Sequence, residues 1–154
     1  MNEYEEKLKK FMRDHDIHGE HLSFEESCHS VKEAAKAANA NIEEFVKNIC
    51  MIDSQGNLVV AIVKGENRAS TSGIGEALNI KRPRIATPEE ILDKTGYPCG
   101  GVPSFGYEAV FLIDPKVMEE DIVFTSGGSE NSLVKISARE LRKANRGRIV
   151  RIRK

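Results

Sequence analysis

The chain has 154 residues, of which 40% are hydrophobic and 31% are charged, and its formal net charge is -1. This balance is typical of a single globular domain, and the near-neutral charge excludes a histone-like nucleic-acid binder. The longest apolar run, 58–63, is much shorter than the about 20 residues of a membrane helix, and the charged segment 1–10 does not have the apolar core of a signal peptide.

Short helices and strands alternate in the first half of the chain. The expected elements are, in order, a helix over 2–14, a strand over 21–25, a helix over 30–39, a further turn over 41–47, and two hairpin strands over 49–52 and 58–63. Ser30 and Glu33 have the spacing of a capping box, which marks the start of the second helix. The turn-rich segment 53–57 between two apolar runs makes the hairpin the clearest element of the chain.

The second half continues this alternation without a repeat or a low-complexity linker. The expected elements are a helix over 73–79, a helix that begins at Pro88, a breaker-rich loop over 95–106, strands over 109–113, 122–124 and 133–136, a helix capped by Ser137, and a strand over 148–152. This irregular order favours one mixed α/β (α+β) domain over 1–154 around a curved sheet, with the N-terminal helix and turn, 1–18, appended to the core.

Cysteine and histidine spacing gives no strong metal signal. Cys28, Cys50 and Cys99 are an odd number and lie far apart, which argues against a disulfide framework and favours a reducing cytoplasm. The three histidines of 15–21 are spaced by three and could share a helix face and a metal, but Gly19 interrupts the helix, so an exposed polar turn is favoured.

Basic residues are concentrated at the C-terminus. The segment 142–154 contains seven bases and no acid, whereas 1–26 contains eight acids and four bases. Two interpretations are open: the C-terminal bases contact phosphate groups, or they solubilise a strand and balance a helix end.

The loop 95–106 is the first candidate for a functional site. It contains four glycines and two prolines in twelve residues. Glycine lets backbone N–H groups approach a ligand closely, and proline stiffens the chain, so such a loop could direct amides at a carbonyl or a developing oxyanion. The alternative is a tight loop without function. If the loop is functional, we expect bulk at Gly100 or Gly101 to abolish activity without unfolding the domain.

Lys47 is the second candidate because it lies at the mouth of the largely apolar stretch 45–52. A lysine that leads into a buried strand could deliver an ammonium group to the end of a pocket, where it would bind a phosphate or a carbonyl. An edge-strand lysine that prevents aggregation is the alternative.

With these residues the chain resembles the YbaK/prolyl-tRNA-synthetase-associated domain family, which comprises free-standing aminoacyl-tRNA editing domains. The loop 95–106 is similar to the family motif T-G-Y-x-x-G-G-V-P-P-F-G, and 45–49 is similar to the strand entry that contains the family's lysine. Further matching segments are 30–35, 63–68, 113–114 and 127–128. The resemblance extends over about 21–152 and therefore includes most of the chain.

The resemblance implies a barrel-like mixed sheet surrounded by helices. It also implies a metal-independent deacylase, without a cofactor, that acts on mischarged tRNA, commonly proline tRNA carrying alanine or cysteine, and it makes prolyl-tRNA synthetase a possible partner. Lys47 would contact the terminal adenosine or its phosphate, and the loop amides, at Gly100 and Gly101, would hold the aminoacyl carbonyl. No protein nucleophile is implied. The residues expected to bind substrate are Tyr97, Val102, Pro103, Ser104 and His29.

Ser104 departs from the family motif, which has a second proline at this position. The serine would make the loop less stiff and could add a hydroxyl group to the pocket, which affects amino-acid specificity. Two other functions therefore stay open beside the editing hydrolase: a non-catalytic module that binds a tRNA end or a nucleotide, and an enzyme that acts on a small ester.

Overall fold

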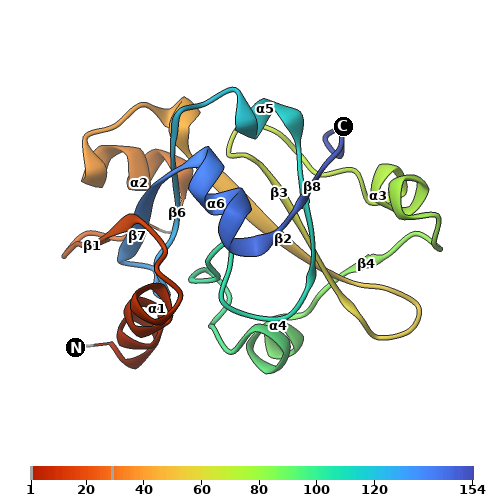
Figure 1. The fold of residues 1–154 in the computed structure, drawn as a ribbon, viewed down its shortest axis with the longest axis horizontal. Coiled ribbons are helices and arrows are strands. Elements are labelled where there is room, and N and C mark those ends of the chain that lie inside the picture. Colours follow the sequence, from red (N-terminus) through yellow and green to blue (C-terminus); the bar gives the residue numbers. More distant parts are fainter. Residues whose placement is uncertain (1, 29) are drawn as a thin grey trace.

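The computed structural model describes residues 2–28 and 30–154 (Figure 1). The helices are α1 (Glu3–Asp14), α2 (Val31–Ala38), the 3-10 helix η1 (Ile42–Glu44), α3 (Thr71–Leu78), α4 (Pro88–Thr95), α5 (Pro115–Met118) and α6 (Ala138–Asn145). The strands are β1 (Gly19–Ser23), β2 (Val46–Ile52), β3 (Leu58–Lys64), β4 (Arg84–Ile85), β5 (Val110–Ile113), β6 (Ile122–Ser126), β7 (Ser132–Ser137) and β8 (Arg148–Ile149). None of the described helices is long and apolar enough to cross a membrane.

Local capping signals account for the helix boundaries that the sequence predicts. The Ser30 and Glu33 capping box is present at the start of α2, and Asn39 ends this helix in the left-handed conformation. Thr87 and Pro88 start α4 in the same manner, and the Ser137 side chain accepts a hydrogen bond at the start of α6. These helix predictions are confirmed.

The strand predictions are confirmed with shifted ends. β1 begins two residues earlier than predicted, and β8 ends at Ile149 instead of continuing to residue 152. The two-residue strand β4 and the four-residue helix α5 were not predicted. Both are too short to produce a periodic pattern in the sequence.

The strands form two sheets. One is antiparallel, in the order β1-β7-β6, and the other is mixed, in the order β4-β2-β3-β5-β8. The backbone bridge between Phe45 and Phe124 connects β6 with the start of β2. The mixed α/β class is confirmed, but the barrel-like sheet is not: no closed barrel is found among the described strands.

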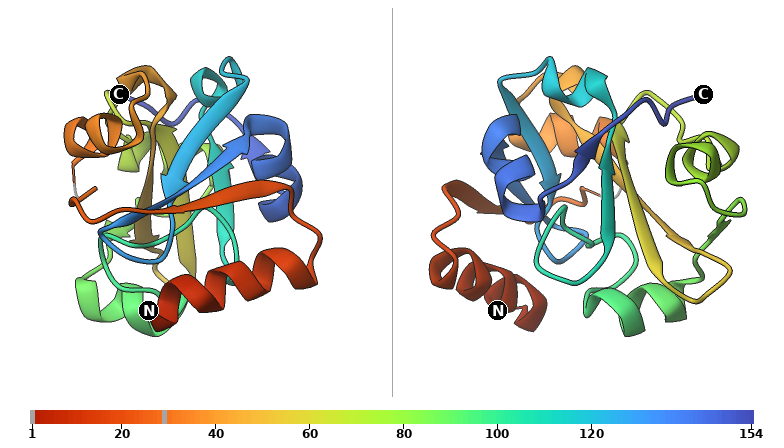
Figure 2. Two further views of the ribbon diagram at one scale, coloured as in Figure 1. Left: turned by 90° about the vertical axis from the view of Figure 1, so that its left-hand side faces the viewer. Right: turned by 45° about the vertical axis from the view of Figure 1, so that its right-hand side comes forward.

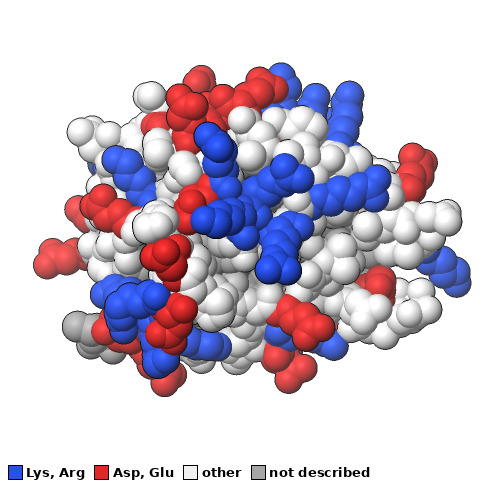
Figure 3. Space-filling view, viewed as in Figure 1, with Lys and Arg blue, Asp and Glu red and all other residues white. Residues whose placement is uncertain are grey.

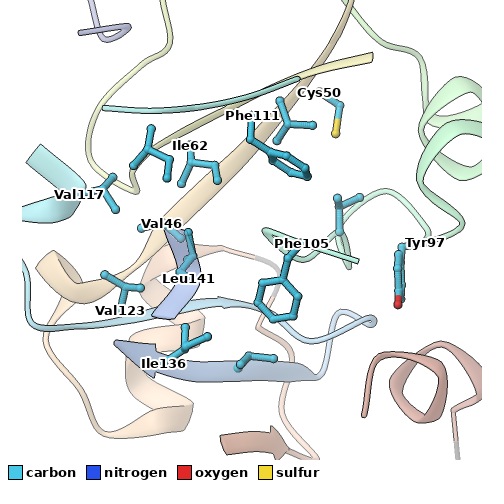
Figure 4. Packing of buried hydrophobic residues seen from close by; sticks show 14 of the residues in the cluster. Val46, Cys50, Ile62, Tyr97, Phe105, Phe111, Val117, Val123, Ile136 and Leu141 are labelled. Atoms are coloured by element: carbon cyan, nitrogen blue, oxygen red, sulfur yellow. The ribbon is translucent and has the colours of Figure 1, made fainter. Parts of the chain in front are cut away.

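The main hydrophobic core fills the space between the two sheets. Figure 4 shows Val46, Ile62 and Phe111 of the mixed sheet facing Val123 and Ile136 of the other sheet across this core. A smaller cluster lies between the opposite face of the mixed sheet and α3, and a third contains side chains of α2, β6 and β7.

Helices α2 and α6 lie on opposite sides of the antiparallel sheet (Figure 2, left). Leu133 of β7 packs in the cluster with Ala34 of α2, whereas its neighbour Val134 packs in the main core with Leu141 of α6. Because successive strand residues point to opposite faces, each helix covers a different face of the sheet.

Helix α1 also belongs to the main core, since Leu8 and Met12 are buried there. The buried Glu5 side chain connects this helix to the antiparallel sheet. Ser23 Oγ donates to Glu5 Oε1 at 2.5 Å, and Ser129 Oγ donates to Glu5 Oε2 at 2.8 Å. Burial raises the pKa of Glu5, but these hydrogen bonds and the nearby His21 outweigh burial, so the net pKa is lowered.

We expect Glu5→Gln to lower the free energy of unfolding by about 2 kcal/mol at pH 7, because charge-assisted hydrogen bonds are lost. A lowered carboxyl pKa in the folded state gives stability that is present above the unfolded pKa and is lost as pH falls through the folded pKa. The wild type should therefore lose more stability than Glu5→Gln on acidification. Urea unfolding between neutral and acidic pH measures this difference, and Glu6→Gln, at an exposed position, is the control. If the free energies of unfolding of the wild type and Glu5→Gln fell in parallel with pH, the prediction would be contradicted.

Candidate functional site

A cavity of about 230 Å³ lies where β2, β6, α2 and the loop 95–106 meet. Its lining combines apolar side chains, such as Phe45 and Phe124, with polar groups that include Lys47, Asn48 and Thr125. The remaining lining residues are Cys28, Ser30, Val31, Ala34, Val46, Ile49, Cys50, Ile91, Cys99, Gly100, Val102, Ser126 and Leu133. The cavity thus has the apolar walls and few polar groups that are typical of a small-ligand site.

Lys47 lies on β2, opposite Val63 of β3, and lines this cavity. Its side chain is half-buried, and no carboxylate within the described residues forms an ion pair with it. Burial, and next the positive charge of Arg68, lower the pKa of Lys47. A partly desolvated ammonium group without a counter-ion favours an anion or a carbonyl oxygen from a ligand.

Gly100 and Val102 bring the glycine-rich loop to the cavity. The amide of Gly101 donates to the Pro98 carbonyl at 2.9 Å. For the amides of Gly100 and Val102, no acceptor is found in the described part of the chain, and both residues line the cavity.

Gly101 and Pro103 are buried and do not line the cavity. A Cβ atom on Gly101 would lie 2.6 Å from the backbone carbon of Gly128 and 2.7 Å from the amide nitrogen of Ser129. A Cβ atom on Gly128 would in turn lie 2.9 Å from the Tyr4 carbonyl of α1. Gly101 therefore permits close backbone packing, and the sequence-based expectation that bulk there leaves the fold intact is corrected by this geometry.

Ser104 is fully buried and does not present its hydroxyl group to the cavity. Its Oγ donates to Asn48 Oδ1 at 2.6 Å and lies 2.8 Å from Thr125 Oγ1. Asn48 Nδ2 donates to Thr125 Oγ1 and to the Val102 carbonyl, both at 2.9 Å. This polar network links the loop to β2 and β6, and it fixes the orientation of the Asn48 side chain.

We expect Ser104→Ala to lower the free energy of unfolding by about 1.5 kcal/mol, because Asn48 Oδ1 loses its donor in a buried position. The loop should also be held less firmly, which would lower substrate affinity at the cavity. Urea unfolding and ligand titration measure the two effects, and the exposed Ser54→Ala is the control. A variant as stable as the wild type would show that the network contributes little.

The other predicted substrate-binding residues do not line the cavity or lie outside the described residues. Tyr97 is fully buried in the main core (Figure 4), and burial raises its pKa to about 12. Its hydroxyl group has no hydrogen-bond partner in the described residues, and its ring lies 4.6 Å from Lys7 Nζ. Tyr97 thus packs in the main core and does not line the cavity. His29 lies outside the described residues.

The histidines of 15–21 do not come together. His15 stacks on Phe11 at the end of α1, His18 is exposed, and His21 Nε2 lies 2.8 Å from the Gly127 carbonyl. No group of three or more metal-ligating side chains exists among the residues that the structure describes.

All three cysteines line the cavity although they are far apart in the sequence. Burial raises the pKa of Cys28 to about 11 and that of Cys50 to about 12. Both thiols are therefore protonated and poor nucleophiles at neutral pH. Cys99 is exposed at the rim. No sequence pattern indicates this convergence, because it depends on the packing of β2 against the loop.

Three comparisons with known proteins agree with this description. The family model described as "Aminoacyl-tRNA editing domain" matches residues 25–144. The uncharacterized protein YwhH of Bacillus subtilis (strain 168) is 24% identical over 120 residues, which are 77% of this chain and 76% of that protein.

Two solved structures share the fold. The hypothetical protein APE2540 has a TM-score of 0.87 and 26% identity, with 96% of this chain and 99% of that chain covered. A protein described as "a putative trans-editing enzyme for prolyl tRNA synthetase" has a TM-score of 0.92 and 22% identity, with 100% of this chain and 99% of that chain covered.

Proposed function

The chain belongs to the aminoacyl-tRNA editing domain family, and we propose that it is a trans-acting hydrolase that removes a wrong amino acid from tRNA. The observation that carries the proposal is that Lys47 and the loop residues Gly100 and Val102 line one small cavity. A lysine without a counter-ion and two amides without acceptors, among the described residues, provide both a group for the tRNA end and donors for an ester carbonyl.

In the proposed reaction, Lys47 binds the terminal nucleotide, through its phosphate or a ribose oxygen. The amides of Gly100 and Val102 donate to the aminoacyl carbonyl oxygen and stabilise the negative charge that develops on it. A water molecule attacks the carbonyl carbon, the ester C–O bond breaks, and a proton passes to the departing ribose oxygen. The raised pKa values of Cys28 and Cys50 agree with a route that uses no protein thiol.

The substrate proposal is a small amino acid, alanine or cysteine, on proline tRNA. The cavity volume of about 230 Å³ supports a small aminoacyl group. One of the structural relatives is described with reference to prolyl tRNA synthetase, which supports this tRNA and makes the synthetase a candidate partner. Such a reaction would take place in the cytoplasm and would need no metal.

Release of amino acid from a panel of mischarged tRNAs tests the proposal. The panel contains alanine, cysteine and serine on proline tRNA, together with correctly charged proline tRNA. We expect hydrolysis of one small wrong amino acid and little hydrolysis of the prolyl ester. If the folded protein in excess hydrolyses no ester, a binding module becomes the better explanation, and activity on a free aminoacyl ester without tRNA would indicate a small-ester enzyme.

A further inference from the structure

A second cavity, separate from the candidate active site, lies beside α6 and is strongly basic. Four of its six lining residues are Arg139, Arg142, Lys143 and Arg146, and the other two are Met118 and Gly147. Its volume is about 560 Å³. The four basic side chains lie at the surface, and Figure 3 shows Lys and Arg side chains gathered over α6 on this face. We call this cavity the α6 groove.

The α6 groove has an excess of positive charge, because four of its lining residues are basic and none is acidic, while Glu120, Asp121 and Glu140 line an adjoining hollow together with Arg139 and Lys143. None of its four bases has a carboxylate within ion-pair distance among the described residues, whereas Lys64, Arg84 and Arg153 elsewhere form ion pairs. The acid on the same helix, Glu140, accepts a hydrogen bond from the His18 amide. Four positive charges in one hollow favour an external polyanion.

The chemistry of the lining distinguishes between possible polyanions. The groove contains no aromatic residue in its described lining, so it lacks both the aromatic anchors of a typical protein interface and the stacking surfaces that bind unpaired bases. Three of the four bases are arginines, whose planar guanidinium group matches phosphate oxygens. These features suit the phosphodiester backbone of an RNA duplex, which is bound without regard to its sequence.

The position of the groove shows which part of the RNA it could meet. α6 covers one face of the antiparallel sheet, and α2, which lines the active-site cavity, covers the other (Figure 2). The aminoacylated end cannot occupy both places. We therefore propose that the α6 groove binds the duplex backbone of the substrate tRNA at a stretch away from its 3′ end, an inference that rests on the proposed function.

α6 is also attached to the loop of the active site. Asn145 Nδ2, near the C-terminal end of the helix, donates to the Ser104 carbonyl at 2.9 Å. Binding at the groove therefore holds RNA on a helix that is bonded directly to the loop. This hydrogen bond links the helix that carries the groove to the loop that lines the candidate-site cavity.

The test measures binding of uncharged full-length proline tRNA by fluorescence anisotropy over a range of salt concentrations. The double variant Arg139→Gln/Lys143→Gln removes two groove charges and leaves Arg142, which donates to the Gly147 carbonyl. The matched control Lys9→Gln/Lys10→Gln removes two charges from α1. We expect the groove variant to bind roughly tenfold more weakly and its log–log salt slope to be shallower by about two, with no such change in the control.

Three further measurements distinguish a failure of this proposal from a failure of the proposed function. Thermal unfolding should be unchanged in the groove variant. Both the variant and the wild type should bind a 3′-terminal trinucleotide equally. In hydrolysis of mischarged tRNA, the variant should raise KM and leave kcat unchanged. Weaker tRNA binding by the variant would support the proposal that the α6 groove binds tRNA, even if no ester were hydrolysed. The proposal would be overturned if the variant bound tRNA as tightly as the wild type or had the same KM. It would also be overturned if the wild type did not bind tRNA.

Discussion

Replacement of Lys47 by alanine should reduce kcat/KM for mischarged tRNA by about a hundredfold, because a charged hydrogen-bonding group is worth roughly 1.5–3 kcal/mol. Lys47 is the charged residue that lines the candidate-site cavity, and it has no carboxylate partner in the described chain. Removal of its charge leaves no buried counter-ion unpaired, so the domain should remain folded.

Two further variants show whether the charge itself matters. Lys47→Met keeps most of the side-chain volume and should lose as much activity as Lys47→Ala, since the apolar stem is not what binds the tRNA end. The exposed Lys10→Ala, on α1, is the control and should act like the wild type. A folded Lys47→Ala protein with wild-type kcat/KM would exclude the proposed role of the ammonium group.

Replacement of Gly101 by alanine should lower the free energy of unfolding by about 3 kcal/mol and Tm by roughly 6–12 °C for a chain of this size. The added Cβ would lie 2.6–2.7 Å from backbone atoms of Gly128 and Ser129. Backbone cannot rotate away as a side chain can. The turn that contains Gly128 itself packs closely against the backbone of Tyr4 in α1, so it has little room to move away from the added Cβ atom.

Gly56→Ala is the matched control for this prediction. Gly56 lies in the hairpin turn with φ +83°, and nothing lies within 4 Å of an added Cβ. Its substitution costs only the local backbone strain, about 1 kcal/mol. Thermal and urea unfolding compare the two variants. Equal stability of Gly101→Ala and the wild type would contradict the prediction and show that the turn can move to accommodate the added Cβ atom.

The elements that sequence predicts well are those whose signals are local. The capping box at Ser30 and the hairpin around 53–57 each depend on residues within a few positions, and both appear in the structure. The division into two sheets could not be predicted in this way, because it depends on which strands pair over long sequence separations, such as β1 with β7.

The same distinction between local and tertiary signals applies to the candidate site. Lys47 and Gly100 were found from composition and family resemblance, and both line the cavity. Asn48 was missed, although one signal was present: it alternates with the buried Val46 and Cys50 on β2 and so is a polar residue on a core-facing register. Such a residue requires hydrogen-bond partners, but Ser104 and Thr125 could be identified only from the fold.

The position of the cysteines makes the candidate-site cavity accessible to a chemical reporter without any mutation. Cys99 is exposed at the rim, whereas Cys28 is half-buried and Cys50 is buried, and burial raises the pKa of both of these thiols. A thiol-reactive fluorophore should therefore label Cys99 first. Its emission would respond when a tRNA end enters the cavity, which would allow occupancy to be followed in real time, independently of hydrolysis.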